Sequence, residues 1–145
     1  MVNVLIKKLD PLVEIPTYKT TGASGMDLMS FIREPIKLPP KNSCMVPTGL
    51  SVAFSNKYEI QIRPRSGLAA KNNISVLNTP GTIDSDYRGE IKIILFNQGT
   101  SEFIINNKDR IAQMILMPVH KMELEEVENL PDTLRGKGGF GSTGK

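Results

Sequence analysis

Five short stretches of this chain combine charged, hydroxyl, amide and glycine residues in patterns that can bind an anion or activate water. They lie at residues 24–30, 63–71, 78–90, 108–116 and 135–144. Arginine and serine side chains and glycine-rich backbone supply hydrogen-bond donors for an anion. A positioned carboxylate, in contrast, can take a proton from water. Each stretch is therefore a candidate part of a site, and each also has a purely structural explanation.

The stretch at 135–144, RGKGGFGSTG, holds five of the twelve glycines of the chain. Glycine lets backbone N–H groups approach a phosphate closely, and Ser142 and Thr143 add hydroxyl donors. Arg135 can bind a terminal phosphate through two hydrogen bonds, and Phe140 can stack on a base. Taken alone, however, this composition is more typical of a disordered tail than of a site.

Three internal positions carry polar side chains that need a partner. Arg65 and Ser66 stand at the start of a short helix predicted over residues 66–72, with Ser66 as its N-cap. Free N–H groups there can bind an anion, although a capped helix beside a solvated arginine explains the pattern equally well. Asp27 lies between apolar residues, so it must pair with an arginine or sit near a metal-bound water, and structural pairing is favoured. Gln113 interrupts an apolar run and must form a hydrogen bond.

Asp84 is the candidate general base. It follows a β-branched pair, and Asp86, Tyr87 and Arg88 come within the next four residues. A partly desolvated carboxylate in this position can activate water. For an isolated aspartate, a turn with solvated acidic residues is the better explanation. The turn at residues 79–81 separates two apolar stretches and predicts a hairpin.

Composition excludes several other kinds of protein. Cys44 and His120 are the only cysteine and histidine, so neither an internal disulfide nor an ordinary zinc site can form, and we expect a buried structural thiol and a surface histidine. A bound metal should be a hard cation held by oxygens, with a phosphate as one of its ligands.

The net charge of +3 is spread over scattered basic residues, which argues against nucleic acid as a partner. Short apolar runs and the lack of a secretory signal predict no membrane partner and a cytoplasmic location.

The pattern of short apolar runs separated by turn residues predicts an all-β sandwich or barrel. The expected strands are residues 2–8, 26–31, 45–54, 58–63, 74–77, 90–97, 101–105 and 110–119. Residues 120–128 are charged, but their alternation slightly favours a half-exposed strand over a helix. Composition changes at Leu130–Pro131, so we expect one domain over residues 1–130 and a flexible tail over 131–145.

In this order the five stretches resemble the five sequence motifs of the trimeric dUTP diphosphatase (dUTPase) family. The motifs in question are SGMDL, RPRSGLAAK, GTIDSDYRGE, DRIAQMIL and RGKGGFGSTG, which span nearly the whole chain. The resemblance implies a jelly-roll-like β-barrel of the dUTPase-like β-clip type, forming a homotrimer with a mobile C-terminal arm. It also implies Mg²⁺-dependent hydrolysis of dUTP to dUMP and pyrophosphate, which would limit uracil incorporation into DNA and supply dUMP for dTMP synthesis.

The resemblance also implies roles for particular residues, at sites shared between subunits. Asp84 would orient and activate water, and Tyr87 would pack on deoxyribose and exclude a 2′-hydroxyl. Asp27 would act through water near Mg²⁺, which substrate phosphates and water would mainly hold. The C-terminal aromatic would cover uracil while its neighbours grip the γ-phosphate. The implied substrate-binding residues are Arg65, Ser66, Gly67, Asn78, Gly81, Thr82, Ile83, Tyr87, Lys92, Gln113, Arg135, Gly138, Phe140, Gly141, Ser142 and Thr143.

Two positions depart from the family pattern. Lys108 stands where the fourth motif usually has glycine, which should alter a turn and leave the chemistry intact, and Ser24 replaces a frequent alanine. Two alternatives remain open. A dCTP deaminase shares the fold but lacks the full glycine-rich fifth motif. A non-catalytic nucleotide-sensing protein on the same scaffold would be expected to have lost Asp84 or the tail, and both are present.

Overall fold

The computed structural model describes residues 1–139, and almost all of its regular structure is β-strand. Short β-branched runs between turn residues form these strands, as the sequence pattern predicts. In chain order the elements are β1 (Leu5–Lys8), β2 (Met26–Met29), β3 (Ile36–Leu38), β4 (Ser43–Pro47), β5 (Leu50–Ala53), β6 (Tyr58–Arg63), α1 (Ser66–Asn72), β7 (Ile74–Val76), β8 (Gly81–Ile83), β9 (Lys92–Asn97), β10 (Phe103–Ile105) and β11 (Arg110–Pro118).

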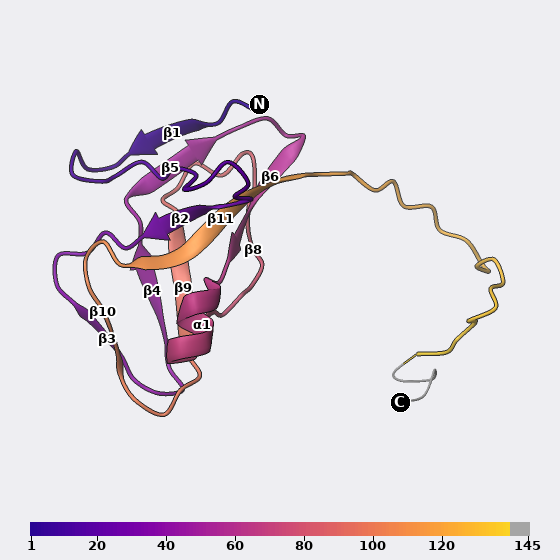
Figure 1. The fold of residues 1–145 in the computed structure, drawn as a ribbon. Helices are drawn as coiled ribbons and strands as arrows, with labels where there is room; N and C mark the ends of the chain where they lie inside the picture. The colour runs from indigo at the N-terminus through magenta and orange to yellow at the C-terminus, as the bar shows by residue number, and fades with distance from the viewer. Residues whose placement is uncertain (140–145) are drawn as a thin grey trace.

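The strands pair antiparallel in four sheets that wrap around one core (Figure 1). The largest sheet has the order β2-β11-β6-β8, and the second has the order β4-β9-β7. Two strand pairs, β1-β5 and β10-β3, complete the arrangement. The hydrogen bonds described within residues 1–139 therefore confirm the all-β class, but they do not join these sheets into a closed barrel.

The core lies between the inward faces of these sheets. Along β9 and the residue before it, Ile91, Ile93 and Leu95 are almost completely buried, while the residues between them are partly or fully exposed. Burying an aliphatic side chain of this size stabilises the fold by roughly 1.5–3 kcal/mol. Asn97 is fully buried as well, and its amide group donates to the carbonyl oxygens of Leu38 and Ser101, both at 2.9 Å. The core is therefore apolar apart from polar groups that are hydrogen-bonded.

The predicted strand at 45–54 is in fact two strands, β4 and β5, which are separated by a turn at Thr48 and Gly49. Gly49 has a φ of +68°, a backbone conformation that favours glycine. A Cβ at this position would also press on Val13 and on the ring of Phe31. The chain reverses here, so the two strands can enter different sheets.

Two further expectations were wrong in detail, and two strands were not expected. Helix α1 begins at Ser66 itself, so the N-cap position belongs to Arg65, whose extended backbone (φ −89°, ψ 128°) carries no side-chain cap. The turn at 79–81 joins strands of two different sheets, because β7 pairs with β9 and β8 pairs with β6. Strands β3 and β8 were not among the expected strands.

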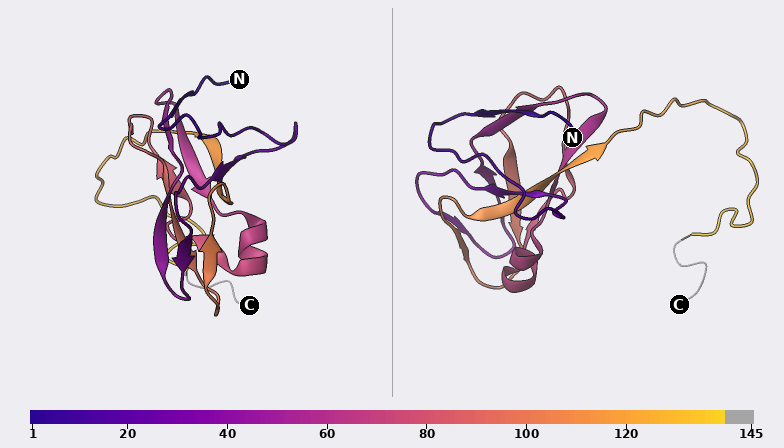
Figure 2. Two further views of the ribbon diagram at one scale, coloured as in Figure 1. Left: turned by 90° about the vertical axis from the view of Figure 1, so that its left-hand side faces the viewer. Right: turned by 45° about the horizontal axis from the view of Figure 1, so that its top comes forward.

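No strand forms over residues 120–128, because the chain leaves the body after β11 and meets no partner strand there (Figures 1 and 2). The last backbone tether to the body is the amide of Val119, which donates to the carbonyl of Lys57 at 2.8 Å. From there to residue 139 the chain is extended and mostly exposed. Within residues 1–139, no helix is long and apolar enough to cross a membrane.

Candidate active site

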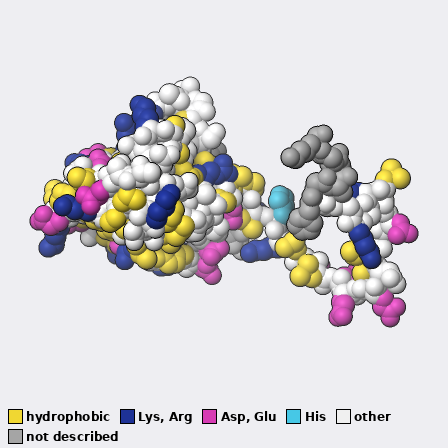
Figure 3. All heavy atoms as spheres, turned by 90° about the horizontal axis from the view of Figure 1, so that it is seen from below, with side chains coloured by type: hydrophobic (Ala, Val, Ile, Leu, Met, Phe, Trp, Pro, Cys, Tyr) yellow, Lys and Arg dark blue, Asp and Glu magenta, His cyan; other side chains and the backbone are white. Residues whose placement is uncertain are grey.

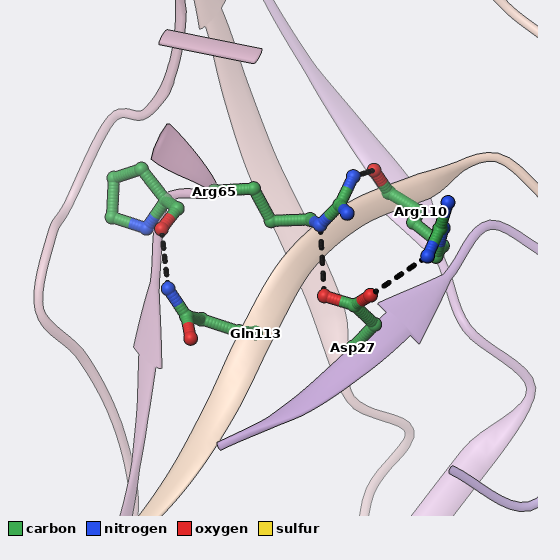
Figure 4. Close-up of polar contacts among 5 residues, drawn as sticks. Asp27, Arg65, Arg110 and Gln113 are labelled. Atoms are coloured by element: carbon green, nitrogen blue, oxygen red, sulfur yellow. Dashed lines mark hydrogen bonds and ion pairs between the residues drawn. The ribbon is translucent and has the colours of Figure 1, made fainter. Parts of the chain in front are cut away.

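Asp27 on β2 lies between two arginines that come from different parts of the chain (Figure 4). Its Oδ1 atom is 2.8 Å from Nε of Arg65, and its Oδ2 atom is 3.4 Å from Nη1 of Arg110. A second bond, from Nη1 of Arg65 to the carbonyl of Arg110 at 3.1 Å, holds the two arginines together. Of the two partners left open for Asp27, the structure therefore shows the arginine. The cluster keeps one net positive charge, because two guanidinium groups face one carboxylate.

Gln113 lies beside Asp27 on the same sheet and meets the hydrogen-bonding expectation. The register pairs Gln113 of β11 with Asp27 on one side and with Arg63 of β6 on the other. Its Nε2 atom donates to the carbonyl of Pro64 at 2.9 Å (Figure 4). This bond fixes the end of β6 where the chain turns into Arg65 and Ser66, so Gln113 helps to set the start of helix α1.

Ser66 and Gln113 share an open hollow of about 560 Å³, which Gln61, Arg63, Pro64, Thr79 and Pro80 also line. Sequence reasoning missed Arg63. Its guanidinium donates to Oε1 of Gln61 from Nε at 3.1 Å and from Nη2 at 2.6 Å. Within residues 1–139 it forms no ion pair with a carboxylate. A sign of its position was available, because polar residues alternate with isoleucines along β6 and place Arg63 on the outer face.

A second, much smaller cavity of about 40 Å³ lies beside β8, close to the first. Five of the implied substrate-binding residues line it, together with apolar residues of β6, β7 and β9: Asn78, Gly81, Thr82, Ile83 and Lys92. Gly81 lets Asn78 approach, because a Cβ there would be 3.2 Å from Nδ2 of Asn78 and 3.4 Å from Cβ of Ile62. The cavity is therefore narrow, and its walls combine aliphatic side chains with polar groups that include the Asn78 amide and the Lys92 ammonium group.

The loop that follows β8 carries Asp84 and Tyr87. Both side chains are exposed, Tyr87 to 44%. The amide of Tyr87 donates to the carbonyl of Asp84 at 3.1 Å, and its hydroxyl donates to the carbonyl of Glu90 at 3.0 Å. The Glu90 carboxylate in turn accepts from the amide of Gly49 at 2.8 Å. The loop is thus fixed to the β4–β5 turn, and Asp84, its first residue, is exposed to solvent.

Of the residues implied for the C-terminal arm, the two that the structure describes, Arg135 and Gly138, are not brought to this region. Arg135 donates from Nε to the carbonyl of Gly138 at 2.9 Å, a contact within the extended segment itself. Phe140, Gly141, Ser142 and Thr143 lie outside the described residues. Figure 3 shows the charged and hydrophobic side chains of the extended segment standing clear of the body. Among residues 1–139, no hydrogen bond or ion pair joins Asp84 or Tyr87 to the Asp27 cluster.

The donor set does not form a protein cage for a metal. Within residues 1–139, no three His, Cys, Asp or Glu side chains come together to hold an ion, and both oxygens of Asp27 contact arginines. Mg²⁺ usually keeps several waters and binds through substrate phosphates with few carboxylates. A Mg²⁺ ion here would therefore have to be held mainly by a ligand's phosphates and by water, and Asp27 is the carboxylate bonded to Arg65.

The lone cysteine and histidine lie apart from this region. Cys44 on β4 is half-buried rather than fully buried, and it packs against the core. Burial raises the pKa of its thiol above the ordinary value, so the thiol is not activated. His120 is exposed just beyond β11, as expected for a surface histidine. Neither residue takes part in the candidate site.

The Asp27 cluster brings two arginines together beside Ser66 and Gln113, and such a set of donors can bind a phosphorylated ligand. The family sequence model of dUTPase matches residues 12–144. The deoxyuridine 5′-triphosphate nucleotidohydrolase of Wolinella succinogenes is 53% identical over 143 residues, covering 99% of this chain and 95% of that protein. The enzyme of the same name from Chlamydia pneumoniae is 54% identical over 138 residues, covering 94% and 95%. The chain belongs to the dUTPase family.

Solved structures agree on the fold. A mutant dUTPase of Staphylococcus bacteriophage 80alpha, solved with dUpNHpp, superposes with a TM-score of 0.89 at 23% identity and covers 99% of both chains. A mutant dUTPase from phage phi11 of S. aureus, described with a structural Mg(II) ion, gives a TM-score of 0.80 at 20% identity, covering 90% of this chain and 99% of that one. At these identities the likeness concerns the fold alone.

Proposed function

We propose that this protein is a dUTP diphosphatase that hydrolyses dUTP to dUMP and pyrophosphate. Its family membership and its relatives at 52–54% identity, named for this activity, support the proposal. The structural observation that carries it is the cavity of about 40 Å³ lined by Asn78, Gly81, Thr82, Ile83 and Lys92. This cavity lies immediately before the loop that presents Asp84.

The small cavity would receive the polar edge of a pyrimidine base. Backbone groups of β8 and the amide of Asn78 can pair with the polar edge of uracil, and the aliphatic side chains of Ile83 and its neighbours can pack on its faces. Because the cavity is narrow, its wall would clash with the extra methyl group of thymine and so exclude that base. Tyr87, on the following loop, would stand against the deoxyribose and leave no room for a 2′-hydroxyl.

In this proposal Asp84 accepts the proton of the attacking water. The water oxygen bonds to phosphorus, the bond between the α-phosphoryl group and its bridging oxygen breaks, and pyrophosphate leaves. Arg65, Ser66 and Gln113 would neutralise and orient the phosphates, the contribution that phosphoryl transfer needs most from a protein. Mg²⁺ bound to the triphosphate would supply further charge neutralisation. Asp27 would act on it through water while holding Arg65 in place.

We further propose a homotrimer with a jelly-roll-like barrel in each subunit and shared active sites. The separation of the extended segment from the body supports this arrangement (Figure 1). That segment exposes large apolar side chains, with Met122 at 84%, Leu124 at 86% and Leu130 at 82%. Such residues are costly to leave in water, and another subunit would cover them. The arm from residue 131 would then close over a neighbouring site. A cytoplasmic location completes the proposal.

The experiment is a nucleotide panel. Purified protein with Mg²⁺ is given dUTP, UTP, dTTP and dCTP in turn, and pyrophosphate release and base deamination are both measured. Release from dUTP at least 100-fold faster than from the other three, without deamination, supports the proposal. Equal rates on dUTP and UTP would rule out the pocket assignment, and deamination of dCTP would point to the related deaminase activity.

A further inference from the structure

Gly89 lies against the hydroxyl end of the Tyr87 ring. A Cβ atom at Gly89 would be 2.5 Å from Cζ of Tyr87 and 2.9 Å from Cε2, and closer still to the hydroxyl oxygen. Ordinary van der Waals contact for such an atom begins at 3.4 Å. The ring therefore rests against the glycine backbone, and even one methyl group at position 89 would force the ring away.

The same loop holds the ring at two further points. The Tyr87 hydroxyl donates to the carbonyl of Glu90 at 3.0 Å, and the Tyr87 amide donates to the carbonyl of Asp84 at 3.1 Å. The Glu90 side chain is tied through the amide of Gly49 to the β4–β5 turn. With Gly89 against its hydroxyl end and Glu90 at its tip, the exposed ring has one preferred orientation before any ligand binds.

We propose that Gly89 is a positioning residue that sets the discrimination between deoxyribose and ribose through Tyr87. The inference rests on the proposed function, in which Tyr87 forms the wall beside C2′. A steric wall rejects one hydroxyl group only if its position is fixed to within a fraction of an ångström. Glycine is the only residue type that allows the ring to lie this close to the backbone, because it has no Cβ atom.

The consequence of a methyl group at position 89 follows from the distances. Cζ of Tyr87 must move by roughly 1 Å to reach ordinary contact, which pulls the hydroxyl from the Glu90 carbonyl and frees the ring. A misplacement of about 1 Å in a positioning element can cost about 100-fold in rate. The rate on dUTP should fall, while the rate on UTP, already low because of the wall, should fall less or rise.

The test compares Gly89→Ala with Gly22→Ala. The control makes the same chemical change where an added Cβ meets nothing within 4 Å. For each protein, kcat/KM is measured with dUTP and with UTP. We expect Gly89→Ala to lower the dUTP-to-UTP ratio at least tenfold and Gly22→Ala to leave it unchanged. A Gly89→Ala protein with the unaltered ratio would overturn the proposal.

A double mutant shows whether Gly89 acts through Tyr87. In a Tyr87→Ala background the wall is already absent, so adding Gly89→Ala should change the dUTP-to-UTP ratio by less than twofold. A further large loss in that background would mean that Gly89 acts by another route and would contradict the proposal. An unfolded Gly89→Ala protein would contradict it too, because a clash with an exposed ring should be relieved by ring movement alone.

A readout without nucleotide separates this inference from the proposed function. The chain has three tyrosines, so protein labelled with 3-fluorotyrosine should give three ¹⁹F resonances. Gly89→Ala should shift the Tyr87 resonance, assigned with Tyr87→Phe, while Gly22→Ala should not. If wild-type protein fails to hydrolyse dUTP, the proposed function is wrong whatever this spectrum shows. If dUTP is hydrolysed and the resonance does not move, only the positioning role of Gly89 is wrong.

Discussion

The guanidinium of Arg65 is held 2.8 Å from the carboxylate of Asp27, which lies 38 residues earlier in the chain. Both side chains are less than a third exposed, at 27% and 20%. The Asp27→Asn substitution should lower the free energy of unfolding by about 1–2 kcal/mol, because it removes one charge-assisted hydrogen bond and leaves two arginines side by side. Denaturant unfolding measures this loss.

The same Asp27→Asn protein should also show a raised KM for dUTP, because Arg65 loses the group that orients it. Glu14→Gln is the matched control. It breaks the ion pair with Lys108, in which both side chains are more than half exposed, so neither the unfolding midpoint nor KM should change. An Asp27→Asn protein that matches the wild type in both measurements would show that the Arg65 contact has no structural role.

Lys108 occupies a left-handed backbone conformation, with φ of +66°. A backbone conformation of this kind favours glycine, the residue that the family pattern usually has there. Replacing Lys108 by glycine should stabilise the protein by about 1 kcal/mol, since a side chain in this region costs about 1–2 kcal/mol. Thermal unfolding measures the gain. Lys108→Ala removes the same ion pair but keeps a Cβ, so a gain of equal size in that variant would refute the backbone explanation.

The thiol of Cys44 should react slowly in the folded protein. Burial raises its pKa, and the thiolate is the reactive form. At pH 8, iodoacetamide should modify folded protein at least tenfold more slowly than protein in urea. The neutral thiol contributes fully to stability when the pH is below the pKa that Cys44 has in the unfolded chain. This contribution is lost as the pH rises through the higher pKa that Cys44 has in the folded protein. Cys44→Ala should therefore reduce the loss of stability at alkaline pH, and an unchanged pH profile would contradict this sign.

Removal of residues 135–145 should leave the assembly intact but nearly inactive. Within residues 1–139, the side chain of Arg135 contacts only the carbonyl of Gly138, so truncation breaks no described contact with the body. Light scattering should still report a trimer, while dUTP turnover falls about 100-fold or more. Deletion of Lys145 alone is the control, because it lies beyond the family match at residues 12–144. If the truncated protein dissociates, the arm is needed for assembly, and this prediction is wrong.

Periodicity within the chain predicted most strands, because the alternation of Ile60 and Ile62 with polar residues depends only on local sequence. Pairing could not be predicted in the same way. The partners of β7 and β8 are set by packing between distant segments, so the local turn at Pro80 suggested a hairpin that the two strands do not form. The helix bounds were predicted correctly, but the N-cap was assigned to Ser66, whereas Arg65 takes the N-cap backbone geometry without a capping side chain.

For the candidate site, the motifs named candidate residues but could not give their contacts. The need of Asp27 for a partner followed from its apolar neighbours, yet only the fold brings Arg65 and Arg110 to it. Arg63 was overlooked, although its alternation with the isoleucines of β6 placed it on the outer face of the strand. The support that Gly89 gives Tyr87 depends on a ring conformation, which no sequence pattern specifies.

The most direct test of the account is the Asp84→Asn substitution. The amide keeps the size of the side chain but cannot accept a proton from water, so turnover of dUTP should fall about 100-fold to 10,000-fold. Binding of dUTP, measured by calorimetry with Mg²⁺, should stay within a fewfold of wild type. Loss of turnover with retained binding is the predicted result. Turnover close to that of the wild type would mean that another group activates the water, and the site as described would be wrong.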